Sequence, residues 1–428
     1  MPPFSPGRAP VRRVAVPLRT LLLSAALLVA SPAFSQPTLS LDEALRRSLA
    51  VDPAAAGVAA RLEAARANVR QADVGPNPSL GVEVENFTGS GRFAGLGRTE
   101  ATVSYQQTYE RGGKRQARTA LAQSETGLVQ ARAEVRRLDL AKAVQLAFVD
   151  VLAAQAQVAV AEEQLTVAER AEREVSRRVA GARDPLFAGA RAEAELAHAR
   201  VSLDRAQVDA RNARAALAAY WNGSADFVVP AGLFEDTRQP EGGVGTVETP
   251  DLKLLAVEQA VAAARIAVEQ TRAVQDPTLS LGVRHLQDEG AVALVVGATL
   301  PLGRYNTNRG AIDRARAERT AIAADLGALR IERERETARL IARRASAAAQ
   351  VRQTEVEVVP NAQRAVTLVR EGFNRGGFSY LDVIAAQRAL IEVRSRRVEI
   401  LKIFHQDGAS LDRLTGAHAL LAGTETQP

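Results

Sequence analysis

The segment Ser79-Leu-Gly-Val-Glu-Val-Glu-Asn-Phe87 alternates between two kinds of residue. Leu80, Val82 and Val84 fall on one side of a period of two, and small or acidic residues fall on the other. This period is typical of a β-strand with one apolar and one polar face. A tilted strand of about 9–11 residues is long enough to cross a bilayer.

Three further segments alternate in the same way, at 100–109, 278–286 and 292–300. A glycine-rich stretch, 88–97, joins the first pair of predicted strands, and Asp288-Glu-Gly290 joins the second pair. The chain therefore supplies four predicted strands of bilayer length. Charged residues on their polar sides are the candidates for a wet barrel lumen. These candidates are Glu83, Glu85, Glu100 and Arg284.

The rest of the chain has the periodicity of long helices. From 114 to 180 there is no proline, and apolar residues recur every seven positions in two series four residues apart. Sustained spacing of this kind predicts a coiled coil. One series is Leu140, Ala147, Ala154, Ala161, Ala168 and Val175, and the other is Val144, Val151, Val158, Leu165 and Val179.

Helix lengths suggest how these helices pack. A second long helix is predicted at 308–373, and return helices are predicted at 186–221 and 379–415. At 1.5 Å per residue, a 67-residue helix is about 100 Å long. Shorter helices at 53–73 and 251–274 could stack end to end with the return helices and cover the long ones.

The two halves of the chain share one plan. Asn77-Pro-Ser-Leu80 resembles Asp276-Pro-Thr-Leu279, and two interruptions of the helical regions have a similar spacing, which indicates a repeat of roughly 195 residues. We therefore predict a tandem repeat. The predicted parts are a first unit at 36–222, an irregular equatorial linker at 223–250, a second unit at 251–416 and a tail at 417–428.

The first 35 residues have the features of an export signal. Four arginines precede the apolar stretch 21–30, and small residues follow it around Ser35. This order predicts a cleaved signal peptide at 1–35. A bacterial lipid anchor would need a cysteine, which the sequence lacks. We expect no later apolar segment of membrane-helix length, so insertion into a membrane would use strands.

Composition excludes several classes of function. The chain has no cysteine, 4 histidines and a formal net charge of +6. Its arginines are interleaved with glutamates, which favours solvated helix faces over nucleic-acid binding. We find no cofactor motif, no metal-ligand spacing and no nucleophile–base pair, so we expect neither a resident metal nor an enzyme.

Four strands cannot span a membrane alone. They leave two open edges, and each unpaired amide facing hydrocarbon costs several kcal/mol. Several copies must therefore share one barrel. Two copies would give eight strands and a filled interior, whereas three would give twelve and a lumen. The alternative is a soluble four-stranded sheet packed on helices.

The stretch Glu85-Asn-Phe-Thr-Gly-Ser-Gly91, followed by Gln107-Thr-Tyr-Glu-Arg-Gly-Gly-Lys-Arg115, resembles the CzcC-type heavy-metal branch of the TolC-like outer-membrane efflux family most. Other short motifs across the chain resemble the family as a whole. They are Leu39-Ser-Leu-Asp-Glu-Ala-Leu45, Asn77-Pro-Ser-Leu80, Glu110-Arg-Gly-Gly-Lys-Arg115, Pro301-Leu-Gly303 and the helical segment 376–387. The resemblance implies a mixed α and β membrane protein. Three chains would form a twelve-stranded barrel in the outer-membrane lipid, continued by a coiled-coil tunnel in the periplasm.

The resemblance also implies partners and sites. The homotrimer would dock onto a periplasmic adaptor protein and an inner-membrane pump of the RND type. The candidate docking residues at the two hairpin tips are Arg183, Asp184, Arg375, Gly376 and Gly377.

Asp382 matches one of two acidic residues that form rings at the periplasmic aperture in this family, but Ala385 stands where the second would be. Converging carboxylates would attract cations and raise one another's pKa. The alternative role for Asp382 is a carboxylate in the first turn of a helix. For Arg183 and Asp184 the alternative is an N-cap in a solvated turn.

The sequence therefore predicts a passive export duct, with heavy-metal cations favoured as cargo. The same duct could serve drugs or organic solutes. A periplasmic coiled-coil adaptor and a secreted structural coiled coil are the remaining alternatives. An adaptor would need a compact lipoyl-like β domain, which we do not find in the sequence.

Overall fold

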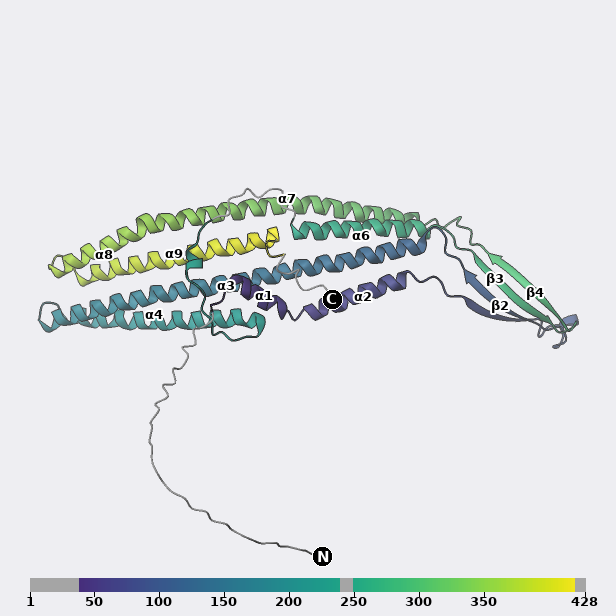
Figure 1. The fold of residues 1–428 in the computed structure, drawn as a ribbon, viewed down its shortest axis with the longest axis horizontal. Helices are drawn as coiled ribbons and strands as arrows, with labels where there is room; N and C mark the ends of the chain where they lie inside the picture. The colour runs from purple at the N-terminus through teal and green to yellow at the C-terminus, as the bar shows by residue number, and fades with distance from the viewer. Residues whose placement is uncertain (1–37, 239–248, 420–428) are drawn as a thin grey trace, which may run out of the picture. The chain divides into compact units, whose positions relative to one another are not determined.

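Four strands form one antiparallel sheet in the order β1-β2-β3-β4 (Figure 1). They are β1 (Ser79–Glu85), β2 (Glu100–Thr108), β3 (Thr278–Leu286) and β4 (Ala291–Thr299). The central pairing joins the two halves of the chain, since β2 pairs with β3. Within the residues that the structure describes, β1 and β4 pair on one side only, so the sheet has two open edges. The prediction of four strands per chain is confirmed.

The computed structural model describes residues 38–238 and 249–419 of the 428-residue chain. The predicted signal peptide at 1–35 lies outside the described residues. So do 239–248 of the predicted linker and 420–428 of the predicted tail.

One helix, α3 (Lys114–Ala180), contacts helices from both repeats (Figure 1). It packs against α2 (Ala55–Ala72) and α6 (Pro250–Arg272), which adjoin the sheet. Further along it packs against α4 (Leu186–Ala218) and α9 (Tyr380–Thr415). Residues from both predicted heptad series are buried along α3, among them Val144, Val151 and Val175. The short and return helices therefore cover α3 in succession.

The second long helix is built from three segments. They are α7 (Arg309–Gln353), a π-helical turn η3 (Thr354–Val358) and α8 (Val359–Asn374). We predicted one uninterrupted α-helix at 308–373, and the π-helical turn is the difference. Pro360 has no amide hydrogen to donate to the carbonyl four residues before it, so a wider turn preceding it accommodates the missing bond.

The helices lie side by side, and the order of neighbours differs between the two ends of the helical region. Near the sheet the order is α2–α3–α6–α7, and near the hairpin tips it is α4–α3–α9–α8 (Figure 1). The outermost helices on one side, α2 and α4, belong to the first repeat, as does edge strand β1. Those on the other side, α7 and α8, belong to the second repeat, as does edge strand β4.

A belt of short elements covers the middle of α3 and α9. It contains α1 (Leu41–Ala50), η2 (Ala219–Trp221) and α5 (Gly232–Glu235), and a parallel bridge joins Thr38 to Val228. The largest apolar cluster of the described residues lies here, where belt and helix side chains pack together. Its fully buried members include Leu45, Val144, Val151, Leu401 and Phe404.

Helix α3 contains a window that is long and apolar enough to cross a membrane by length and composition. Our expectation that no such segment follows the signal peptide was therefore wrong. The apolar residues of α3 are explained by packing, since Val144, Phe148, Val151 and Leu152 belong to the buried cluster of the belt. A helix that packs in a protein core can be as long and as apolar as a helix that spans a membrane.

Candidate functional site: a two-faced sheet, a strand-to-helix joint and two hairpin tips

The strand register brings all four predicted lumen residues to one face of the sheet. Glu83 lies opposite Thr102, which in turn lies opposite Arg284. Glu85 lies directly opposite Glu100. Partners across antiparallel strands, and residues two apart along one strand, point to the same side. We call this side the polar face.

Three of the four lumen residues form a bridge across β1, β2 and β3, which we call the Glu85–Arg284–Glu100 bridge. Nη2 of Arg284 lies 3.0 Å from Oε2 of Glu85, and Nη1 lies 2.8 Å from Oε2 of Glu100. Nε of Arg284 donates to the Thr102 hydroxyl at 2.9 Å, and Asn86 donates to Oε1 of Glu100 at 3.2 Å. The bridge leaves the polar face with an excess of carboxylates.

The opposite face of the sheet is mostly apolar and exposed, with Gln107 and His285 as its polar members. Its large apolar side chains are between 46% and 79% exposed in the single chain. A contiguous exposed apolar surface of bilayer length is suited to contact with lipid. The residues are Leu80, Val82, Val84, Val103, Tyr105, Leu279, Leu281, Val283, Val292, Leu294 and Val296.

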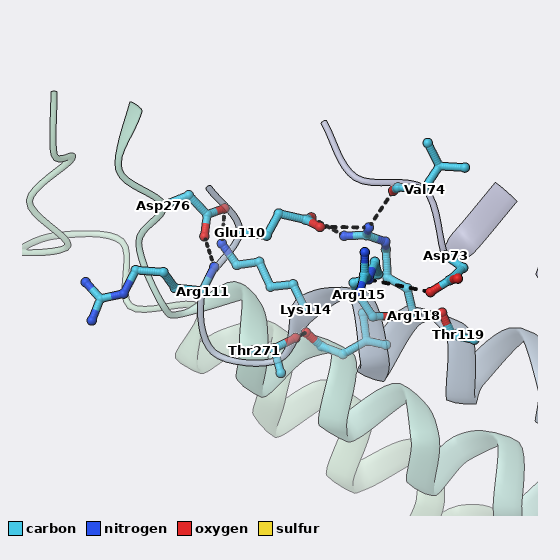
Figure 2. Close-up of polar contacts among 11 residues, drawn as sticks. Asp73, Val74, Glu110, Arg111, Lys114, Arg115, Arg118, Thr119, Thr271 and Asp276 are labelled. Carbon is cyan, nitrogen blue, oxygen red and sulfur yellow. Dashed lines mark hydrogen bonds and ion pairs between the residues drawn. The ribbon is translucent and has the colours of Figure 1, made fainter. Parts of the chain in front are cut away.

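A network of ion pairs joins the end of β2 to the start of α3, and Figure 2 shows it. We call this network the joint. Asp276, just before β3, accepts a hydrogen bond from the Arg111 amide at 2.9 Å and one from Nζ of Lys114 at 2.5 Å. Burial acts to raise the pKa of Asp276, but the bonds from Lys114 and Arg111 outweigh it and hold this pKa below its ordinary value. The joint therefore ties the first repeat to the second.

Two further contacts attach α2 to the joint (Figure 2). Arg118 pairs with both carboxylate oxygens of Glu110 and donates to the Val74 carbonyl at 3.2 Å. The hydrogen bond with Glu110 raises the pKa of Arg118. Arg115 lies 3.5 Å from Asp73, and both of these side chains are largely exposed. The first turn of α3 thus holds the segment that leads into β1.

The glycines of the Glu110–Arg115 motif are needed for close approach. Gly112 has φ of +69°, and a Cβ there would lie 2.7 Å from a methyl carbon of Val274. Gly113 also has a positive φ, of +75°. A side chain at Gly112 would both strain the backbone and push the two repeats apart.

The first hairpin tip is fixed by a residue that we did not predict. Arg178 binds both carboxylate oxygens of Asp184, at 2.8 and 3.0 Å, and the Asp184 bond raises the pKa of Arg178. The guanidinium also lies 4.3 Å from the ring centroid of Phe373 and donates to its carbonyl at 3.3 Å. Asp184 is therefore part of a link between the two hairpins.

The alternative that we gave for Arg183 and Asp184 needs correction. The N-cap position of α4 is Pro185, and it makes no side-chain cap. Asp184 turns back toward α3 because the Arg178 guanidinium offers it two hydrogen bonds. Arg183 is exposed and donates its amide to the Arg178 carbonyl at 2.8 Å.

The second tip is a glycine turn followed by a capping box. Gly376 has φ of +82° with open space around it, and the Gly377 amide donates to the Gly372 carbonyl at 2.8 Å. Arg375 is exposed and lies 3.8 Å from Glu371. All three candidate docking residues at this tip are exposed, so a partner could reach them.

Asp382 has the first-turn role that we gave as its alternative. Its carboxylate accepts the Ser379 amide at 2.9 Å and the Ser379 hydroxyl at 2.7 Å, and Ser379 caps the Asp382 amide in return. The hydrogen bonds from Ser379 lower the pKa of Asp382 in the single chain. Whether three copies converge on an axis is a property of the assembly, so the aperture role of Asp382 stays a prediction.

No group of three or more His, Cys, Asp or Glu side chains that could hold a metal ion occurs in residues 38–238 and 249–419. A two-faced sheet continuous with long helices has the features of a membrane duct.

Comparison with known proteins identifies the family. The family model for outer membrane efflux proteins matches residues 44–223 and 248–417, so the chain belongs to this family. It is an outer-membrane efflux channel protein, in a family of ducts rather than of enzymes.

Individual relatives agree with this assignment. The chain is 29% identical to the cobalt-zinc-cadmium resistance protein CzcC of Cupriavidus metallidurans, over 88% of this chain and 90% of that protein. It is 28% identical to the nickel and cobalt resistance protein CnrC of the same organism, over 67% and 69%. The fold matches that of the Vibrio cholerae outer membrane protein VceC with a TM-score of 0.70 at 21% identity, covering 88% and 96%.

We predict that Asp276→Asn lowers the free energy of unfolding by about 1–3 kcal/mol, because the charged acceptor for Lys114 is lost. The pKa of Asp276 is lowered in the folded protein. Its stabilisation is therefore complete above the ordinary aspartate pKa of about 4 and is lost as pH falls below it. Thermal unfolding of the wild type and variant should differ at pH 7, and the difference should shrink as pH falls below about 4 and through the lowered pKa of Asp276.

Asp73→Asn is the matched control, because Asp73 belongs to the exposed pair with Arg115. Exposed pairs contribute little, so this variant should unfold with the wild type. Equal stability of Asp276→Asn and wild type at pH 7 would contradict the assigned role of Asp276.

Proposed function

We propose that the chain is the exit duct of a tripartite export system for heavy-metal cations. Three copies pool their strands into a closed twelve-stranded barrel, and their helices continue it as a tunnel through the periplasm. The observation that carries this proposal is the two-faced, four-stranded sheet with two open edges. Such edges cannot face lipid, because unpaired backbone groups there cost several kcal/mol each.

The number of copies follows from the need for a lumen. Two copies would supply eight strands, and a barrel of that size is filled by its own side chains. Three copies would supply twelve strands and leave space for a hydrated solute. The Glu85–Arg284–Glu100 bridge and Glu83 would then line that space, and the apolar face would contact lipid.

The outer helices support the same closure. On α4, Phe187, Val201 and Val208 lie on the side opposite the alanines that pack on α3, and they are 70%, 66% and 43% exposed. Their spacing is that of one heptad position, which suits a second helix. At the opposite edge of the layer, Val358 and Leu368 are 41% and 57% exposed. We place the α4 row of one copy against the α8 edge of the next.

Heavy-metal cations are the favoured cargo for two reasons. CzcC and CnrC are resistance proteins for cobalt, zinc, cadmium and nickel by their names. The polar face carries three carboxylates against one guanidinium among the four lumen residues, and this balance favours cations. Organic solutes remain the second candidate, and neutral ones would make no use of this charge.

An inner-membrane pump of the RND type and a periplasmic adaptor complete the proposed system. The adaptor would dock at the tips, through Arg183, Asp184, Arg375, Gly376 and Gly377. Membership of the efflux-channel family contradicts the alternative that this chain is itself an adaptor. We further propose that the duct is passive and has no enzymatic activity.

The proposal predicts a conducting trimer with a metal phenotype. The purified protein should run as a heat-dissociable trimer and form cation-preferring pores in a planar bilayer. A strain lacking it should lose tolerance to zinc, cobalt and cadmium and keep its tolerance to organic toxicants. Loss of tolerance to organic toxicants, with tolerance to the metals kept, would instead assign organic solutes as the cargo.

The edge contact can be tested with Val201→Asp. A carboxylate in the α4 row should weaken association by about 2–3 kcal/mol per interface, because an apolar side chain is lost from a buried site. The trimer should therefore dissociate at lower temperature while helix content stays unchanged. Ser202→Asp, one residue along and outside the row, is the control. An unaffected Val201→Asp trimer would exclude α4 from the interface.

The aperture role of Asp382 predicts a change in cation flow. Asp382→Ala should lower the cation-to-anion permeability ratio of the reconstituted trimer, because a ring of negative charge is removed. Ser379→Ala removes the cap and keeps the carboxylate, so it separates helix capping from charge. Equal permeability ratios in wild type and Asp382→Ala would exclude the aperture role and leave Asp382 with its role in the capping box alone.

A further inference from the structure

We propose that Arg284 prevents metal cargo from binding in the barrel by occupying the position between Glu85 and Glu100. This inference rests on the proposed function, in which the polar face lines the lumen and metal cations pass along it. Arg284 is thereby a specificity-determining residue of the duct, one that keeps a carboxylate pair from retaining the ions it attracts.

The geometry of the carboxylate pair is that of an incomplete cation site. Glu85 and Glu100 are direct cross-strand partners on one face, and a single guanidinium lies 3.0 Å from one and 2.8 Å from the other. Oε2 of Glu85 is buried and accepts no hydrogen bond, although Arg284 lies within ion-pair distance. Removal of Arg284 would leave that oxygen without a counter-charge and able to ligate a cation.

The surrounding groups would complete the site if Arg284 were removed. The Thr102 hydroxyl, now an acceptor for Nε of Arg284, would be a third oxygen between the two carboxylates. Glu85, Glu100 and Arg284 are 42%, 23% and 30% exposed, so an ion in the lumen could reach them. Carboxylate and hydroxyl oxygens bind divalent cations, and affinity rises with the number of charged ligands.

A duct loses throughput when a site holds its cargo, because conduction requires binding weak enough for release. A guanidinium stays protonated at any physiological pH, so it cannot vacate the position by losing its charge. Its fork also lies within ion-pair distance of two carboxylates and donates to one hydroxyl at once. The bridge thus keeps negative charge on the wall without leaving a ligand set open.

Glu83 provides the contrast within the same face. It is exposed, and among the described residues it makes no salt bridge. Its direct neighbour across the strands is Thr102, which is not a carboxylate. A single carboxylate attracts cations without chelating them, so Glu83 needs no built-in counter-charge.

The test is block of the reconstituted full-length channel by Cd²⁺ or Zn²⁺ in planar bilayers with potassium as the charge carrier. Arg284→Gln should be blocked at a concentration about tenfold or more below that for wild type, since a positive charge within a few ångströms of the site is gone. Arg284→Lys keeps a charge and should behave as wild type. Arg284→Gln combined with Glu100→Gln should lose the added sensitivity.

Glu83→Gln is the matched control and should not lower the blocking concentration, because it leaves the Glu85–Arg284–Glu100 bridge in place. Equal block of wild type and a conducting Arg284→Gln channel would overturn the proposal. If Arg284→Gln does not assemble, Arg284→Ser is tested in its place. Failure of both to assemble would also overturn the proposal, because Arg284 would then serve folding. A wild-type protein that conducts no ions would instead count against the proposed function.

Discussion

Unpaired backbone groups at a strand edge are the constraint on which the rest of this structure depends. A peptide group facing hydrocarbon has no water to bind, so an open edge is costly in a bilayer. This chain presents one edge from each repeat, β1 and β4, and its helices place first-repeat elements on one side and second-repeat elements on the other. Contacts between unlike edges are head-to-tail and close into a ring when the rotation allows.

The joint explains how a strand layer and a helix layer stay in register. Strands and helices have different pitch and spacing, so the turn between them must be held in place. At the start of α3, Lys114 binds Asp276 in the segment before β3, and Arg118 binds the Val74 carbonyl in the segment before β1. The Arg111 amide, between β2 and α3, also binds Asp276. The equivalent of Asp276 in the first repeat is Asn77, which cannot form the ion pair. The repeats are thus alike in topology and unlike at the joint.

Sequence periodicity predicted the elements because it marks their apolar faces, which are packed against neighbours on the helices and exposed on the strands of the single chain. Alternation predicted the four strands and the shared face of Glu83, Glu85, Glu100 and Arg284, since strand geometry alone fixes which side a residue faces. Periodicity could not predict contacts between segments that are far apart in the sequence. Asp276 lies 162 positions from Lys114, and Arg178 meets Phe373 across 195. Only the motif around Glu110–Arg115 hinted at the joint, and no pattern marked Arg178.

We interpret the distribution of charged residues as a compromise between attracting a cation and releasing it. Arginine–carboxylate pairs occur at the tip, at the joint and on the sheet, and in each place they join separate elements. The one-to-one pairs at the tip and the joint stabilise the structure without adding net charge. In the proposed duct, the carboxylates in excess of arginine on the polar face would supply the field that acts on a passing ion. On this proposal, the charges that hold the structure together are distinct from the excess carboxylates that would act on the cargo.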